Sequence, residues 1–111
     1  MLIYKIFRPS EWSGMQGQGE TAGSAADIAD GFVHFSTAAQ LPGTLAKHFA
    51  GEPDLILLAC DADALGAELR WEPARGGALF AHLYRPLRMD DVLWTRPLQT
   101  GGADQGIGDL E

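Results

Sequence analysis

The stretch Asp30-Gly31-Phe32-Val33-His34-Phe35-Ser36-Thr37 predicts a strand that leads directly into a helix. Residues 31–35 have the apolar and aromatic character of a buried strand, and Thr37 is of a type that commonly caps a helix. His34 therefore lies in the strand, and Ser36 and Thr37 lie at its end. Ligands are often held at strand ends, where a helix N-terminus offers unpaired N–H groups and a favourable field for anions. The stretch predicts a small-molecule site without identifying a reaction.

Length and composition favour one soluble domain. With 111 residues, 46% of them hydrophobic, the chain can bury roughly two-thirds of its unfolded surface. The longest apolar run, Leu55 to Cys60, is far shorter than the roughly twenty residues of a membrane helix, and the N-terminal residues lack the apolar core of a signal peptide. We therefore expect a cytoplasmic protein that does not associate with membranes. Cys60 is the only cysteine, so neither an internal disulfide nor a cysteine-based zinc site is expected.

The charge balance bears on partners. Eight basic against fifteen acidic side chains give a formal charge of −7, which repels a nucleic-acid backbone. General nucleic-acid binding is therefore disfavoured, whereas a local site for a small nucleotide is compatible with a few gathered arginines. Nothing in the sequence specifies the oligomeric state.

The order of predicted elements indicates an α+β domain. Strands are predicted at residues 2–8, 31–35, 54–61, 69–73, 80–84 and 92–98, and helices after Pro9, after Ser24, at residues 38–50 and as one turn at 63–66. Strands crowd the second half of the chain, as in an α+β domain and unlike a doubly wound α/β sheet. Residues 1–98 are predicted to form the single domain. Residues 99–111 have too little apolar content to pack and are predicted to be a flexible acidic tail.

Two groups of side chains are candidates for chemistry, and each has a structural alternative. His34, Ser36 and Thr37 could orient a ribose or a phosphate, or they are a core histidine followed by a helix cap. His82 and Tyr84, two residues apart, would project from one strand face with Phe80 beside them as a stacking surface. Their alternative is a half-buried aromatic ladder.

Charged residues complete the candidate set. Glu72, at a strand end, could stabilise a developing cation or act as a base, or it is a solvated acid. Arg8 and Arg85 each close a strand next to a proline, and either could reach an anion, or they are surface arginines. His34, His82 and Glu72 lack the spacing of a recognisable metal site, so no metal is predicted. The sequence favours a packed or partly exposed residue over a ligand for His48, and it assigns Cys60 to the core.

Four segments taken together resemble a known family. They are Ile3-Tyr4-Lys5-Ile6, residues 30–37, Leu69-Arg70-Trp71-Glu72 and His82-Leu83-Tyr84-Arg85-Pro86-Leu87. Over about residues 2–98 the chain resembles the bacterial family known as domain of unknown function 952. Each segment is weak alone, but their combined order is specific. At fold level such domains resemble the ADP-ribosyltransferase group, so the resemblance implies a split, mixed β-sheet flanked by two or three short helices, with NAD bound in a cleft.

The resemblance also implies roles for residues. His34 would match the first-strand histidine that holds the NAD ribose, with Ser36 and Thr37 nearby, and His82 or Tyr84 would match the group that stacks on nicotinamide. Glu72 is the candidate for the transferase glutamate, although the related RNA 2′-phosphotransferases use basic residues instead. The implied catalytic set is His34, His82, Tyr84 and Glu72, and the implied nucleotide-binding set is His34, Ser36, Thr37, Phe80 and Arg85. NAD would be a substrate, cleaved through an oxocarbenium-like state as nicotinamide leaves.

Three functions are therefore compared. The first is an enzyme acting on NAD or on an ADP-ribosylated substrate. The second is a module that binds a nucleotide or metabolite without turnover. The third is a small protein-interaction domain that associates through exposed Trp12 or Trp94.

Overall fold

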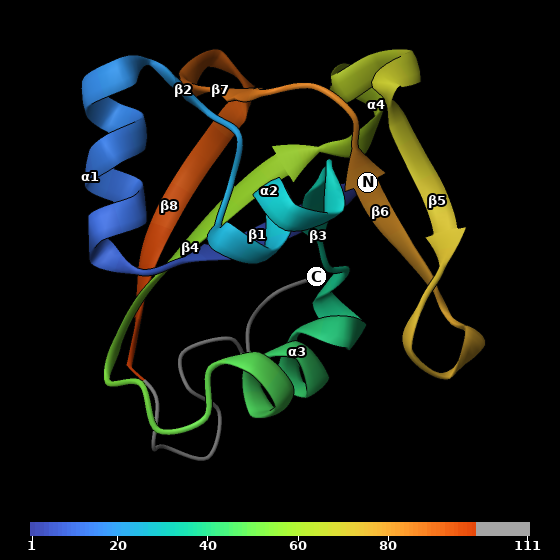
Figure 1. Ribbon diagram of the computed structural model, residues 1–111, viewed down its shortest axis with the longest axis horizontal. Helices are drawn as coiled ribbons and strands as arrows, with labels where there is room; N and C mark the ends of the chain where they lie inside the picture. The colour runs from blue at the N-terminus through green and yellow to red at the C-terminus, as the bar shows by residue number, and fades with distance from the viewer. Residues whose placement is uncertain (100–111) are drawn as a thin grey trace.

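Strands arranged in two separate antiparallel sheets frame the molecule (Figure 1), whose computed structural model describes residues 1–99. The first sheet has the order β1 (Leu2–Phe7), β4 (Asp54–Asp61), β8 (Val92–Gln99). The second has the order β3 (Val33–Phe35), β6 (Leu79–Leu83), β5 (Leu69–Pro73). Two short strands, β2 (Glu20–Thr21) and β7 (Leu87–Arg88), pair with each other. The chain thus folds into a single mixed α/β domain.

Four α-helices connect these strands: α1 (Pro9–Gln18), α2 (Ala25–Asp30), α3 (Leu41–His48) and α4 (Ala62–Leu65). Single 3₁₀ turns occur at Ala38–Gln40, Gly66–Glu68, Arg75–Gly77 and Met89–Asp91. Helix α2 begins with a capping box, since Ser24 Oγ accepts a hydrogen bond from Asp27 N and the Asp27 carboxylate accepts one from Ser24 N. It ends at Gly31, whose φ of 88° requires the left-handed conformation that glycine adopts without strain. These two signals fix the length of α2 and hence the start of β3.

The central strand β4 is buried on both faces. Leu58 and Cys60 face a core between the two sheets, and Leu57 and Ala59 face a second core that α3 covers. This arrangement confirms the prediction from the continuous apolar run at residues 55–60, which is typical of a strand with both faces covered.

The two sheets meet at an isolated bridge between β1 and the end of β3. Tyr4 N donates to Ser36 O and Ser36 N donates to Tyr4 O, each at 2.8 Å. Because no further pairing joins β1 to β3 in the described residues, the space beside this junction is available for side chains from both sheets.

Several predicted boundaries differ from the structure for physical reasons. The predicted helix at 38–50 begins as a 3₁₀ turn, and α3 begins only at Leu41, because Pro42 suits the first turn of a helix and not its interior. The strand expected at 31–35 begins at Val33, because Gly31 caps α2. The expectation of a mixed sheet is wrong, since every strand pair in residues 1–99 is antiparallel. Parallel neighbours need a crossover within one sheet, and here the chain changes sheets instead.

The predicted C-terminal tail lies outside the described residues from residue 100 onward, while β8 extends to Gln99. Within residues 1–99, each helix is too short or too polar to cross a lipid bilayer.

Candidate functional site

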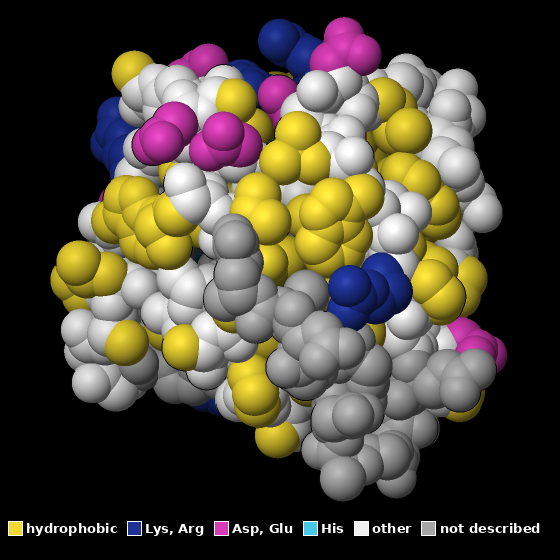
Figure 2. Space-filling view, turned by 180° about the vertical axis from the view of Figure 1, so that it is seen from behind, with side chains coloured by type: hydrophobic (Ala, Val, Ile, Leu, Met, Phe, Trp, Pro, Cys, Tyr) yellow, Lys and Arg dark blue, Asp and Glu magenta, His cyan; other side chains and the backbone are white. Residues whose placement is uncertain are grey.

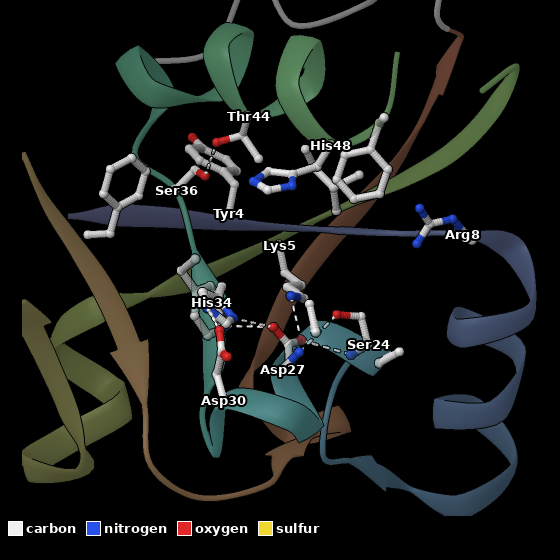
Figure 3. A pocket seen from close by; sticks show the side chains of 16 residues that line it. Tyr4, Lys5, Arg8, Ser24, Asp27, Asp30, His34, Ser36, Thr44 and His48 are labelled. Carbon is white, nitrogen blue, oxygen red and sulfur yellow. Dashed lines mark hydrogen bonds and ion pairs between the residues drawn. The ribbon is translucent and has the colours of Figure 1, made fainter. Parts of the chain in front are cut away.

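A cavity of about 400 Å³ lies beside the junction of the two sheets (Figure 3), and we call it the junction cavity. Strands β1 and β3 and helices α2 and α3 supply most of its walls. Hydroxyl, charged and aromatic side chains all contribute to it. Its lining residues are Tyr4, Lys5, Ile6, Arg8, Ser24, Ala25, Ala26, Asp27, Asp30, His34, Phe35, Ser36, Thr44, His48, Phe49 and Phe80.

A buried ionic network forms one wall of the junction cavity. Lys5 Nζ lies 2.6 Å from Asp27 Oδ2, and His34 Nδ1 lies 2.5 Å from Asp27 Oδ1. The side chains of Lys5 and Asp27 are only 7% and 1% exposed. Backbone N–H groups of Ser24 and His34 also donate to the Asp27 carboxylate, at 2.8 and 3.1 Å. Four donors therefore hold Asp27, and Asp27 in turn fixes the orientation of the His34 ring.

The charges of this network depend on one another. Burial alone would raise the pKa of Asp27, but the hydrogen bond from His34 and the Lys5 ammonium outweigh it and hold that pKa at about 2. Burial lowers the pKa of Lys5 by more than the attraction of Asp27 raises it. Asp27 is therefore ionised at neutral pH, and it is the close counter-charge of the Lys5 ammonium.

The outer side of His34 faces the junction cavity. Its Nε2 lies 3.0 Å from Asp30 Oδ2, and the side chains of His34 and Asp30 are 36% and 54% exposed. On the opposite wall, Ser36 Oγ and Thr44 Oγ1 are hydrogen-bonded at 2.9 Å. Because both ring nitrogens of His34 face carboxylates and Ser36 bonds to Thr44, these residues do not form a Ser–His–Asp nucleophile relay.

A second group, which we call the Glu72 cluster, consists of Glu72, His82, Tyr84 and Phe32. Glu72 Oε1 lies 2.8 Å from His82 Nδ1 and accepts a 2.6 Å hydrogen bond from Tyr84 Oη. The Phe32 ring stacks on the His82 ring with centroids 4.1 Å apart. The pairing of β3 with β6 places His34 opposite His82, with ring centroids 5.3 Å apart. The Glu72 cluster is therefore adjacent to the network of Asp27.

Hydrogen bonding sets the charge state of the Glu72 cluster. The hydrogen bond from Tyr84, followed by the one from His82, lowers the pKa of Glu72. The Tyr84–Glu72 bond also raises the pKa of Tyr84. Glu72 is accordingly an ionised acceptor and Tyr84 a neutral donor at neutral pH. Within residues 1–99, no group of three or more histidine, cysteine, aspartate or glutamate side chains could hold a metal ion.

The structure brings most of the predicted site residues together. His34, Ser36 and Phe80 line the junction cavity. Glu72, His82 and Tyr84 form the neighbouring cluster, which adjoins the cavity through the contact of His82 with His34 and the pairing of Glu72 with Phe80.

Two predicted residues lie elsewhere. Thr37 caps the 3₁₀ turn before α3, which is the helix-cap role that the sequence offers as the alternative to ligand binding. It does not line the cavity. Arg85 forms ion pairs with Asp91 and Glu68 away from the cavity.

Sequence reasoning missed three charged residues of the site: Lys5, Asp27 and Asp30. A lysine at the centre of an otherwise apolar strand was the available signal for Lys5. Asp27 was identifiable only as the capping partner of Ser24. His48, which the sequence leaves out of the site as a packed or partly exposed residue, is exposed and lines the cavity (Figure 3).

The opposite side of the molecule has a different character. Figure 2 shows hydrophobic side chains gathered near its centre and most of the visible acidic side chains toward the top, and no described histidine is visible there. Trp12 and Trp94 are half-buried and pack against the two cores, so each offers only part of its ring to a partner, and the protein-interaction function stays a prediction.

The fold and its cavity define a small α/β domain built from two antiparallel sheets that meet at one bridge. The family model described as "Protein of unknown function (DUF952)" matches residues 6–95, and the chain belongs to that family. This finding confirms the family resemblance inferred from the four sequence segments.

Solved structures of one relative share this fold. The X-ray crystal structure of protein CC0527 from Caulobacter crescentus is 48% identical with a TM-score of 0.89, covering 95% of this chain and 91% of that chain. The solution NMR structure of the same protein is 48% identical with a TM-score of 0.82, covering 94% and 89%. No curated protein matches the chain.

Proposed function

We propose that this protein binds an ADP-ribose-containing nucleotide such as NAD in the junction cavity and acts on it as an ADP-ribosyltransferase-like enzyme. One observation carries the proposal. His34 is held on one side by the buried pair of Lys5 and Asp27, and it lines a cavity of about 400 Å³, where its other nitrogen contacts Asp30. Small-molecule sites have this size and this combination of apolar wall and few oriented polar groups.

The fold supports the proposal by analogy. Two antiparallel sheets that separate beside a cavity are consistent with the split sheet of the ADP-ribosyltransferase group. The analogy implies a first-strand histidine, whereas His34 lies on β3 and β1 contributes Lys5. Because a fold does not determine a function, the proposal rests on the side chains of the site.

The lining residues suit the parts of a nucleotide. The hydroxyl groups of Ser36 and Thr44 can exchange their mutual hydrogen bond for bonds to ribose hydroxyls. The ring of Phe80 offers an aromatic surface against a base. His34 Nε2 supplies a donor whose direction Asp27 fixes from the other side of the ring.

Cleavage of NAD requires stabilisation of positive charge on the ribose as nicotinamide leaves. Glu72 is an ionised carboxylate, and its bonds to His82 and Tyr84 hold it in one orientation. A fixed carboxylate can stabilise such a cation electrostatically. We assign this role to Glu72, with His82 and Tyr84 as its positioning residues.

A second function, nucleotide binding without turnover, is favoured by one observation. Glu72 does not line the junction cavity, and His82 separates it from His34. A carboxylate that cannot approach the ribose would leave a binding site and no catalyst. This alternative predicts saturable binding without release of nicotinamide.

The experiment is a ligand-detected NMR titration with NAD, ADP-ribose and nicotinamide, accompanied by an assay for nicotinamide release. We expect saturable binding by the wild-type protein and loss of binding in His34→Ala, with amide spectra confirming that the variant is folded. The matched variant Glu72→Gln should bind ADP-ribose normally and lose nicotinamide release. Equal binding by wild type and His34→Ala, or no binding at millimolar ligand, would contradict the proposal.

A further inference from the structure

The two nitrogens of His34 are bonded in very different ways. On the Nδ1 side, Asp27 is almost completely buried and is held by donors from Lys5, Ser24 and the His34 backbone. On the Nε2 side, Asp30 is 54% exposed, and its contact with His34 is 3.0 Å long. The inner bond is a fixed part of the fold, whereas the outer bond is accessible to solvent and to any molecule in the cavity.

The contact of His34 Nε2 with Asp30 also defines which hydrogen-bonding group His34 offers to a ligand. An ionised carboxylate can only accept a hydrogen bond, so Nε2 is the donor in its contact with Asp30. His34 therefore presents an N–H at the position that Asp30 occupies. An oxyanion at that position would make the same charge-assisted hydrogen bond.

The place of Asp30 in the structure also makes its contact with His34 easy to exchange. Lys5 and Asp27 neutralise each other inside the protein, so the outer contact of His34 with Asp30 is not part of that buried ion pair. Asp30 is the last residue of α2, where a negative charge is disfavoured by the helix dipole. A ligand oxyanion that takes the place of Asp30 at Nε2 makes the same contact, while the exposed Asp30 side chain turns to solvent, which screens its charge.

We propose that Asp30 is an internal stand-in for a ligand oxyanion, and that the junction cavity binds phosphate-bearing ligands by exchanging Asp30 for a phosphate oxygen at His34 Nε2. The inference deepens the proposed function, on which it rests for the identity of the nucleotide. Asp30 then sets the affinity of the junction cavity for anionic ligands. Asp30 is thus a specificity-determining residue that competes with the ligand.

The test is isothermal titration calorimetry, which measures the affinity of the wild type, Asp30→Asn and Asp30→Ala for two probes, inorganic pyrophosphate and ADP-ribose. Removing an exposed competing ion pair should strengthen binding by about fivefold, the factor that corresponds to about 1 kcal/mol. Asp90→Asn is the matched control, because it changes the net charge equally at an exposed position outside the cavity. Its binding should equal that of the wild type at physiological salt.

The outcomes separate this inference from the proposed function. If only the Asp30 variants bind both probes more tightly, and adding His34→Ala to them abolishes binding, the role of Asp30 and the proposed nucleotide site are both supported. Unchanged or weaker binding in the Asp30 variants, with wild-type binding still dependent on His34, overturns the role of Asp30 and leaves the nucleotide site standing. Tighter binding of pyrophosphate without any binding of ADP-ribose supports the anion position and overturns the proposed nucleotide. An equal gain in Asp90→Asn would overturn the inference, because net charge alone would then explain it.

Discussion

Replacing Asp27 with asparagine should destabilise the protein strongly. The substitution keeps the size of the side chain but leaves the Lys5 ammonium, 7% exposed, without its counter-charge 2.6 Å away. Removing one partner of a buried ion pair typically costs about 3–5 kcal/mol, a large share of the roughly 5–15 kcal/mol that stabilises a domain. For a domain of this size, such a loss lowers the melting temperature by at least about 12 °C.

Urea denaturation followed by tryptophan fluorescence measures this effect. The double variant Lys5→Met/Asp27→Asn removes the unpaired ammonium while the amide oxygen can still accept from His34, so it should recover at least half of the lost stability. Asp61→Asn is the control, because Asp61 pairs with the N-terminal ammonium at 3.6 Å on the surface, where a pair contributes at most about 1 kcal/mol. The reasoning is refuted if Asp27→Asn costs less than about 1 kcal/mol, or if the double variant is no more stable than the single one.

Two further predictions concern ionisation. The pKa of Asp27 is depressed from 3.8 to about 2 in the folded state, so its contribution is fully present above pH 4 and is lost as the pH falls through 2. The loss is about 2 kcal/mol, and urea unfolding between pH 6 and pH 2 should show it in the wild type but not in Asp27→Asn; parallel curves would contradict it. Burial raises the pKa of the Cys60 thiol to about 12, so an aromatic disulfide reagent should label it only as fast as the protein unfolds. Rapid labelling of the native protein at neutral pH would show that the core around Cys60 opens locally.

Local sequence patterns account for the fold better than for the site. Strand β4 was predictable because a run of apolar residues needs no partner to be identified, and α2 because Ser24 and Asp27 form a capping box within one turn. The contact of His34 with His82 follows from the register of β3 with β6. That register depends on which strands pair, and a single sequence does not specify pairing between distant strands.

The network around Asp27 could not be predicted for a related reason. A lysine in a strand normally directs its charge to solvent, and only the packing of α2 against β1 and β3 turns Lys5 inward toward Asp27. Arg85 illustrates the converse, because a strand-end arginine that could reach an anion is instead satisfied by Asp91. In both cases the local sequence gives the charge, and tertiary contacts decide its partner.

Mapping amide chemical shifts during a titration with ADP-ribose tests the central claim most directly. Binding in the junction cavity predicts saturable shifts at Lys5, His34, Ser36 and Thr44, which line it from three different elements, and the loss of all of them in His34→Ala. Shifts confined to surfaces distant from these residues, or no shifts at millimolar ADP-ribose, would contradict the assignment of the junction cavity as a nucleotide site.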